Sequence, residues 1–264
     1  MHNSHHLHQG DGISGFDLLL VLLLIISLGC YFSAVIKCVH SGKAWPFYRM
    51  ILWVLGVACI FFAVSGPIAK QAHLDFSAHM LVHLLLGMLA PLLLVLAAPI
   101  TLTLKTVNVK LGRRLTKVLR SHFVRFISGP ITASVLNIGV LWLLYSSSLY
   151  RQMHEIALLN VVVHLHIFLA GYVFTSSIIY IDPAPHRTSF LQRAMVFATA
   201  LAGHGILAKY IYAHPPAGVP AKQAQDAGML MYYGGDAIDL MLIVIFCFQW
   251  YKASRPVKAL ETYY

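Results

Sequence analysis

Histidine and aspartate side chains recur inside long apolar segments of this sequence. His79 and His83 lie in one such segment, His164 and His166 in a second, His204 in a third, and Asp236 and Asp239 in a fourth. If these segments cross a membrane, each unpaired ionisable side chain costs roughly 2.5–3.5 kcal/mol or more. We therefore treat all seven as candidate functional residues.

The spacing within two of these segments indicates which side chains can share a ligand. Residues four apart on a helix lie on one face, with Cβ atoms about 5–6 Å apart, so His79 and His83 could grip one metal ion. His164 and His166 lie about 200° apart around a helix axis, so both cannot face one small site. We expect one of them to be a ligand and the other to hydrogen-bond to a ligand or a neighbouring helix.

Composition indicates which elements must position these side chains. The 264 residues are 59% hydrophobic and 11% charged, against about 45–50% and about 25% in soluble domains. Seven segments are long and apolar enough to cross a membrane as helices: 16–38, 49–66, 79–104, 130–149, 158–181, 190–212 and 229–251. We therefore expect an all-α membrane protein, a bundle of about seven transmembrane helices. Pro91 and Pro99 should kink the third helix or end it early.

The basic residues of the connections predict the orientation of the bundle. With the amino terminus outside and the carboxyl terminus inside, fifteen Lys and Arg side chains lie inside and three outside, as the positive-inside rule requires. The net charge of +10 therefore reflects membrane loops rather than a nucleic-acid groove. Apolar residues at helical spacing among the basic residues of 109–126 predict a helix lying on the anionic membrane surface.

This orientation brings the candidate residues to one depth. His79 and His83 fall in the first turns of a helix that starts outside. At about 1.5 Å per residue, His164, His204 and Asp236 lie about 9, 12 and 10 Å below the outer ends of their helices. We therefore expect the histidines and aspartates to converge in the outer half of the bilayer.

Side chains of these types favour a transition metal. Imidazole and carboxylate suit copper, zinc or iron, and nearby thioethers would favour Cu(I). Four methionines are expected near the outer surface: Met80, Met153, Met229 and Met231. Methionine is also a common filler of apolar helices, which is the alternative role for them. The four cysteines form no CxxC pair, which argues against a thiolate zinc site or a disulfide framework.

The two ends of the chain, outside the helices, say less about function. We expect residues 1–15 to be a His-rich extracytoplasmic tail, 16–252 the seven-helix transmembrane domain, and 253–264 a cytoplasmic tail. The tail histidines His2, His5, His6 and His8 could capture metal outside the membrane. A purification tag or a polar tail explains them nearly as well.

Several of these residues occur in motifs that resemble a known family. The stretch His79-Met80-Leu81-Val82-His83, followed by Ala90-Pro91 and Ala98-Pro99, resembles the third-helix signature of the CtaG-type cytochrome c oxidase assembly family. Further similarity lies in His164-Leu165-His166 with Gly171 and Asp182-Pro183, in Ala-Gly-His204-Gly, and in Gly235-Asp236 leading to Gln249-Trp250. It extends over residues 75–252. The family carries Gly-Glu where this chain has Gly235-Asp236, so the carboxylate here is one methylene shorter.

The resemblance implies a multi-pass protein of the bacterial inner membrane that helps to build haem-copper oxidase. We expect a non-enzymatic factor that takes copper, favoured as Cu(I), from an extracytoplasmic donor and passes it to an oxidase subunit by ligand exchange. The expected ligands are His79, His83 and one of His164 or His166, followed by His204. Asp236 or Asp239 would orient a ligand or balance charge.

Two other functions fit the same residues. One is a bis-histidine haem protein that carries electrons, with axial ligands on different helices. Visible absorption would distinguish it, because a haem band is intense and Cu(I) is colourless. The other is a transporter that uses His and Asp as a metal or proton relay, which vesicle uptake would reveal. A retinal protein is excluded, because the last helix has no mid-membrane lysine.

Overall fold

The computed structural model describes residues 15–255, and within this range the chain forms helices and connections without any strand. The all-α prediction is therefore confirmed. The histidines predicted to form an outer tail, and residues 256–264 of the predicted carboxyl-terminal tail, lie outside the described residues.

Six helical segments of the described chain are long and apolar enough to cross a membrane. They are α1 (Gly15–His40, apolar from Leu18), α2 (Phe47–Val64), a composite Phe76–Thr106, α12 (Ala157–Ile178), α13 (Phe190–Ala213) and α14 (Ala221–Ser254). A seventh is a bent pair: Pro130–Ser146, made of α9 (Pro130–Ser134), the π-helical turn η2 (Val135–Gly139) and α10 (Val140–Ser146), then α11 (Leu149–Glu155) at 81°. The prediction of about seven transmembrane helices is confirmed.

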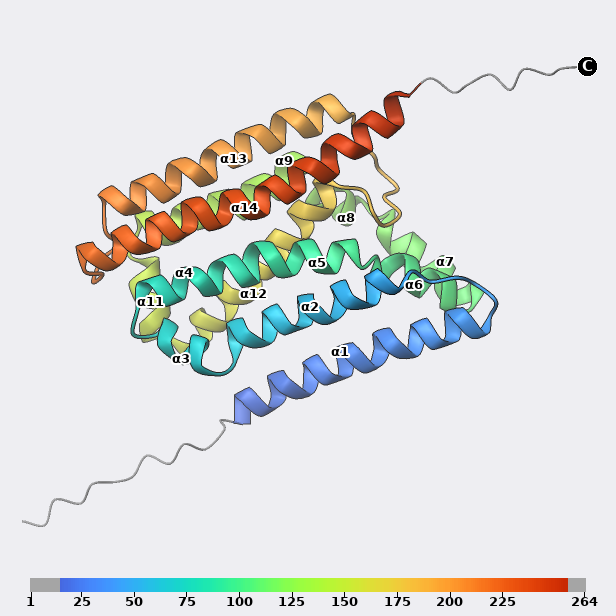
Figure 1. Ribbon diagram of the computed structural model, residues 1–264, viewed down its shortest axis with the longest axis horizontal. Helices are drawn as coiled ribbons and strands as arrows, with labels where there is room; N and C mark the ends of the chain where they lie inside the picture. The colour runs from blue at the N-terminus through green and yellow to red at the C-terminus, as the bar shows by residue number, and fades with distance from the viewer. Residues whose placement is uncertain (1–14, 256–264) are drawn as a thin grey trace, which may run out of the picture.

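The spans run in alternating directions, so their connections gather at two ends of the bundle (Figure 1). One end holds the start of α1, the short helix α3 (Pro67–Ala72), α11 and the connection between α13 and α14; we call it the histidine end. The opposite end holds the α1–α2 connection, α7 (Val109–Leu119) and α8 (His122–Ile127); we call it the basic end. The helix predicted among the basic residues is therefore present, broken into two pieces at Arg120–Ser121.

The last helix is longer than the apolar pattern predicts. It begins at Ala221, two turns before the predicted start at residue 229. Pro220 precedes its first residue, and Lys222 pairs with Asp226 one turn later at 2.8 Å. Helical pairs of this kind stabilise a polar first turn that a search for apolar residues overlooks.

The composite third span is interrupted twice, as its two prolines predict. It consists of α4 (Phe76–Leu84), the π-helical turn η1 (Leu85–Leu89), α5 (Ala90–Leu96) and α6 (Pro99–Thr106). Pro91 lacks the backbone N–H that would bond to the preceding turn. The wider π-helical turn η1 just before it accommodates the proline, so the helix continues. At Ala98 the backbone turns left-handed, with φ of 52°, and α6 restarts at Pro99.

Two side chains from other parts of the fold satisfy the backbone at this break. The Tyr31 hydroxyl on α1 donates to the carbonyl of Ala97 at 2.9 Å. The Asp182 carboxylate accepts hydrogen bonds from the backbone N–H groups of Ile100 and Thr101, at 3.1 and 2.7 Å, and from the Thr101 hydroxyl at 2.6 Å. Asp182 is therefore the N-terminal cap of α6, which explains the Asp-Pro motif after α12.

The interrupted span also allows another helix to approach very closely. Gly171 on α12 lies against the carbonyl oxygen of Gly87 in η1, and a Cβ on Gly171 would overlap that oxygen. Only glycine at this crossing lets the two backbones touch. This contact fixes α12 beside α4 and so sets the positions of the histidines on both helices.

We predict that Asp182→Ala destabilises the bundle by roughly 2 kcal/mol, because the first turn of α6 loses a charged cap. The control is Asp226→Ala, which removes an exposed helical pair worth about 0.3–0.5 kcal/mol. Thermal unfolding of the detergent-solubilised protein measures both. Equal melting temperatures for the two variants would contradict the capping role.

The basic end is predicted to face the cytoplasm. A cytoplasmic reporter fused after Ser121 or after Tyr264 should be active, and a periplasmic reporter at these places silent, because the basic residues resist translocation. Reporter activity of such fusions measures the orientation. A periplasmic reporter active after Tyr264 would reverse it.

Candidate metal site

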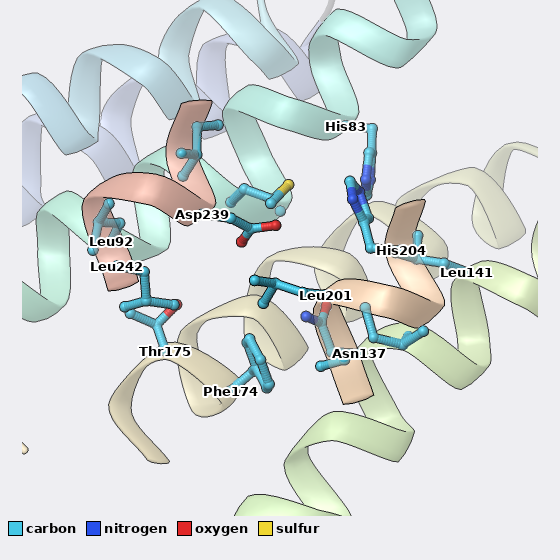
Figure 2. Close-up of a pocket in the computed structure, with 15 residues that line it drawn as sticks. His83, Leu92, Asn137, Leu141, Phe174, Thr175, Leu201, His204, Asp239 and Leu242 are labelled. Carbon is cyan, nitrogen blue, oxygen red and sulfur yellow. The ribbon is translucent and has the colours of Figure 1, made fainter. Parts of the chain in front are cut away.

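Two buried histidines face each other in the interior of the bundle. His83 on α4 and His204 on α13 have ring centroids 6.2 Å apart and ring planes inclined by 27°. Their exposed fractions are 3% and 4%. Figure 2 shows the two rings next to one another at the pocket. The pair links the third and sixth spans. The sequence predicts that the histidines of these two spans lie at the same depth.

Three nitrogen atoms of this pair have no hydrogen-bond partner within residues 15–255. They are Nδ1 and Nε2 of His83 and Nε2 of His204. Leaving a buried polar atom unpaired costs about 1–3 kcal/mol, and such atoms are few in native proteins. Without a ligand, these unpaired nitrogens therefore destabilise the folded protein. A bound group that accepts nitrogen lone pairs would remove this cost.

The spacing of the pair fits one shared metal ion. An ion held linearly between two imidazoles at about 2.0 Å from each nitrogen separates the ring centres by about 6 Å. The observed 6.2 Å matches this value. The ring spacing is therefore compatible with one ion shared by His83 and His204.

A small cavity of about 30 Å³ adjoins the two rings. It has room for a water molecule or an ion. The polar residues that line it come from five spans: His83, Asn137, Thr175, His204 and Asp239, with the thioether of Met88 beside them. Asp239 is 7% exposed, and Figure 2 shows its carboxylate facing into the cavity.

Close backbone approaches shape this site. A Cβ on Gly87 would lie 3.4 Å from the His83 ring and 2.8 Å from Ile167, and a Cβ on Gly235 would collide with the His204 ring. Gly235 therefore makes room for the His204 imidazole, whereas Gly87 makes room for Ile167 beside His83. Asn137 lies in the π-helical turn η2, a kind of irregularity often found at functional sites.

His79 and His83 share a helix but face different partners. The His79 ring lies 5.9 Å from that of His164, and its Nε2 shares a hydrogen bond of 3.2 Å with the Tyr145 hydroxyl. Tyr145 contacts both histidines, with ring centroids 6.1 Å from His79 and 6.4 Å from His83. The two residues predicted to grip one ion therefore belong to two neighbouring groups, with Tyr145 between them.

The remaining candidates lie apart from the cavity. The ring of His166 donates from Nε2 to the carbonyl oxygen of Leu136 at 3.0 Å, so it ties α12 to η2. His166 therefore makes the contact with a neighbouring helix that we expected of one member of this pair, and a ligand role for His164 stays a prediction. Asp236 is exposed on the surface of α14. As the side chains stand, no three His, Cys, Asp or Glu residues within 15–255 are close enough to hold one ion, and the ligand roles stay predictions.

Sequence reasoning missed several residues of this region. His73 and His154 lie outside the long apolar segments, and Tyr145, Asn137 and Met88 are unremarkable within them. Three of the four methionines expected near the outer surface pack in one buried apolar cluster toward the histidine end: Met80, Met153 and Met231. A search for every histidine near a predicted outer helix end would have found His73 and His154.

The fold and these side chains define a multi-span α-helical membrane protein with a histidine site suited to a metal ion. Its family follows from sequence comparison. Residues 29–253 match the cytochrome c oxidase caa3 assembly factor family, and the chain belongs to this family. Membership and the apolar helices together place the chain in a bacterial membrane.

Relatives of this chain occur in mycobacteria. An uncharacterised protein of Mycobacterium leprae is 30% identical over 183 residues, which is 66% of this chain. Uncharacterised proteins of Mycobacterium bovis and Mycobacterium tuberculosis are each 32% identical over 185 residues, 67% of the chain. The chain spans only 28% of the length of these curated relatives. No solved structure matches it.

We predict that His83→Leu makes the metal-free protein more stable. Leucine removes two unpaired nitrogens at a buried position, and each such atom costs about 1–3 kcal/mol. The control is His164→Leu, which removes a nitrogen that donates to the Asn160 carbonyl at 2.9 Å and should therefore bring no gain. Melting temperatures in detergent with a metal chelator present measure the difference. Destabilisation of equal size in both variants would show that the His83 nitrogens are satisfied.

Proposed function

We propose that this chain binds Cu(I) between His83 and His204 and delivers it to a haem-copper oxidase during assembly. The observation that carries the proposal is the set of unpartnered imidazole nitrogens, buried on both sides of a spacing that fits one ion. Family membership supports the destination, since the family is described as assembling caa3 oxidase. The proposed role requires no catalytic residue.

Charge balance favours Cu(I) over Cu(II). Two neutral imidazoles add no charge, and the carboxylate of Asp239 lines the same cavity. With that carboxylate ionised, Cu(I) gives a site of zero net charge, whereas Cu(II) leaves one uncompensated positive charge. An uncompensated charge away from water is costly inside a membrane. The thioether of Met88 beside the cavity also suits the softer ion.

A site with two protein ligands is suited to giving its ion away. Cu(I) accepts a third ligand readily, so a histidine or thiolate of an oxidase subunit can bond to the ion before an imidazole leaves. One copper–ligand bond forms as one breaks, and the oxidation state of the ion does not change. Ligand exchange is therefore the only chemistry required.

The size of the cavity disfavours the haem alternative. Sites for ligands of drug or cofactor size occupy about 300–1,000 Å³, whereas the space beside the two rings measures about 30 Å³. A porphyrin placed between His83 and His204 would have to displace the helices that carry them. A single ion needs no such displacement.

We predict that His83→Gln and His204→Gln each lower Cu(I) affinity by at least tenfold while protein abundance stays unchanged. The affinity should fall because losing a ligand has a larger effect than losing a residue that only orients ligands, which typically costs 10–100-fold. The abundance should stay unchanged because an intramembrane hydrogen bond averages only about 0.6 kcal/mol. Competition with a chromophoric Cu(I) chelator measures affinity. The control is His122→Gln, an exposed histidine at the basic end. Wild-type affinity in both site variants would overturn the assignment.

The delivery step has its own test in cells. A strain without the protein should contain oxidase polypeptide that lacks copper and activity, and strains carrying His83→Gln or His204→Gln should resemble it. Oxidases that contain no copper should keep their activity. Metal analysis of the isolated oxidase measures the outcome, and a full copper complement in the deletion strain would contradict delivery.

A further inference from the structure

A second group of histidines lies at the histidine end, beyond the pair just described. The rings of His73 and His154 have centroids 6.1 Å apart, those of His154 and His79 6.0 Å, and those of His79 and His164 5.9 Å. Four elements supply them: the C-terminal cap of α3, α11, α4 and α12. We call these four residues the outer histidine group.

The bend in the fourth span, between Pro130–Ser146 and α11, brings this group together. Helix α11 turns by 81° from Pro130–Ser146 and so runs across the end of the bundle instead of leaving it (Figure 1). This direction places His154 beside both His73 and His79. Tyr150, one turn earlier on α11, packs against the His79 ring at 5.1 Å and holds α11 in place.

In two members of the group, Nδ1 has a hydrogen-bond partner and Nε2 has none among residues 15–255. His154 donates from Nδ1 to the Tyr150 carbonyl at 2.9 Å, and His164 donates from Nδ1 to the Asn160 carbonyl at 2.9 Å. A carbonyl oxygen only accepts, so the proton lies on Nδ1 and the lone pair on Nε2. Metal-binding histidines usually have this arrangement. His40 at the basic end makes the same bond to its own helix, so this bond alone does not identify a metal ligand. What distinguishes His154 and His164 is the presence of other histidine rings beside them.

Exposure falls steadily from this group to the inner pair. His73 and His154 are exposed, and His164 is partly buried. His79 and His83 are only 2% and 3% exposed. Tyr145, itself 2% exposed, contacts His79 on one side and His83 on the other. The histidines therefore form a continuous series from the surface to the buried site.

We propose that the outer histidine group is a second Cu(I) site, which captures the ion at the membrane surface and loads the pair of His83 and His204. This inference rests on the proposed function of the inner pair. Ring separations of 5.9–6.1 Å fit an ion shared by two imidazoles, which stand about 5–6 Å apart at nitrogen–metal distances of about 2.0 Å.

The ion moves along this series by exchange between pairs. No three of these side chains are close enough to hold it together within the described chain, so each ion has two histidine ligands at a time. In each step one copper–nitrogen bond forms and one breaks, and the copper stays Cu(I). Tyr145 positions His79 through their shared hydrogen bond and also contacts the His83 ring, so it lies between the outer group and the inner pair.

Counting bound Cu(I) tests the proposal. The full chain, with His2, His5, His6 and His8 replaced by Gln, is titrated without oxygen against a chromophoric Cu(I) chelator. We expect two ions in this parent protein and one in the double variant His154→Gln/His164→Gln, which breaks all three close pairs of the outer histidine group, with melting temperatures confirming that both proteins are folded. The matched control is His214→Gln, an exposed histidine at the same end that stacks on Tyr210 and should still permit two ions.

The rate of loading gives a second readout. In the double variant the inner pair should keep its affinity but fill at least tenfold more slowly, because the ion loses its route from the surface. Two bound ions and an unchanged rate in the double variant would overturn the outer site and leave the inner pair standing. Loss of an ion there, with none lost in His83→Gln or His204→Gln, would support the outer site and refute the inner one. A parent protein that binds no Cu(I) would refute both.

Discussion

Polar groups inside a bilayer must find their partners within the protein, because no water is available there. Most of this fold obeys that constraint closely. The break before α6 is satisfied by Tyr31 and Asp182. Arg193, buried near the basic end, donates to the Ile178 carbonyl at 2.6 Å and packs its guanidinium against two aromatic rings. Seven buried side-chain atoms of the described residues still lack a partner, and three of them are the nitrogens of His83 and His204; the others belong to Arg49, Trp53, Ser65 and Arg193. The histidine atoms differ in belonging to two neighbouring rings, His83 with both of its nitrogens, and a shared ligand would satisfy them together.

The sequence predicted the helices well, because length and hydropathy alone decide which segments suit a membrane. It also separated His164 from His166, since helical geometry sends them to opposite sides. It could not predict that His79 and His83 turn to different partners. That outcome depends on Tyr145, which belongs to another span and packs against both rings.

The outer histidine group escaped sequence reasoning for a different reason. His73 and His154 lie in short polar connections, where a histidine carries no cost and therefore no signal. Only the direction of α11 makes His154 a neighbour of both His79 and His73, and hydropathy does not predict a bend of 81° after Ser146. The positions of these histidines depend on how the connections pack against distant parts of the chain. The helices, in contrast, follow from the local pattern of apolar residues.

The bent span has a consequence for the surrounding lipid. Its upright portion, Pro130–Ser146, is about 25 Å long at 1.5 Å per residue, against about 30 Å of hydrocarbon in a typical bilayer. Lipid beside a helix that is too short becomes thinner, or the flanking residues are drawn inward. A membrane surface that dips beside α9 and α10 would keep the exposed His154 on α11 near water without a long extramembrane loop. Bilayer thickness thus helps to determine how accessible the histidines are.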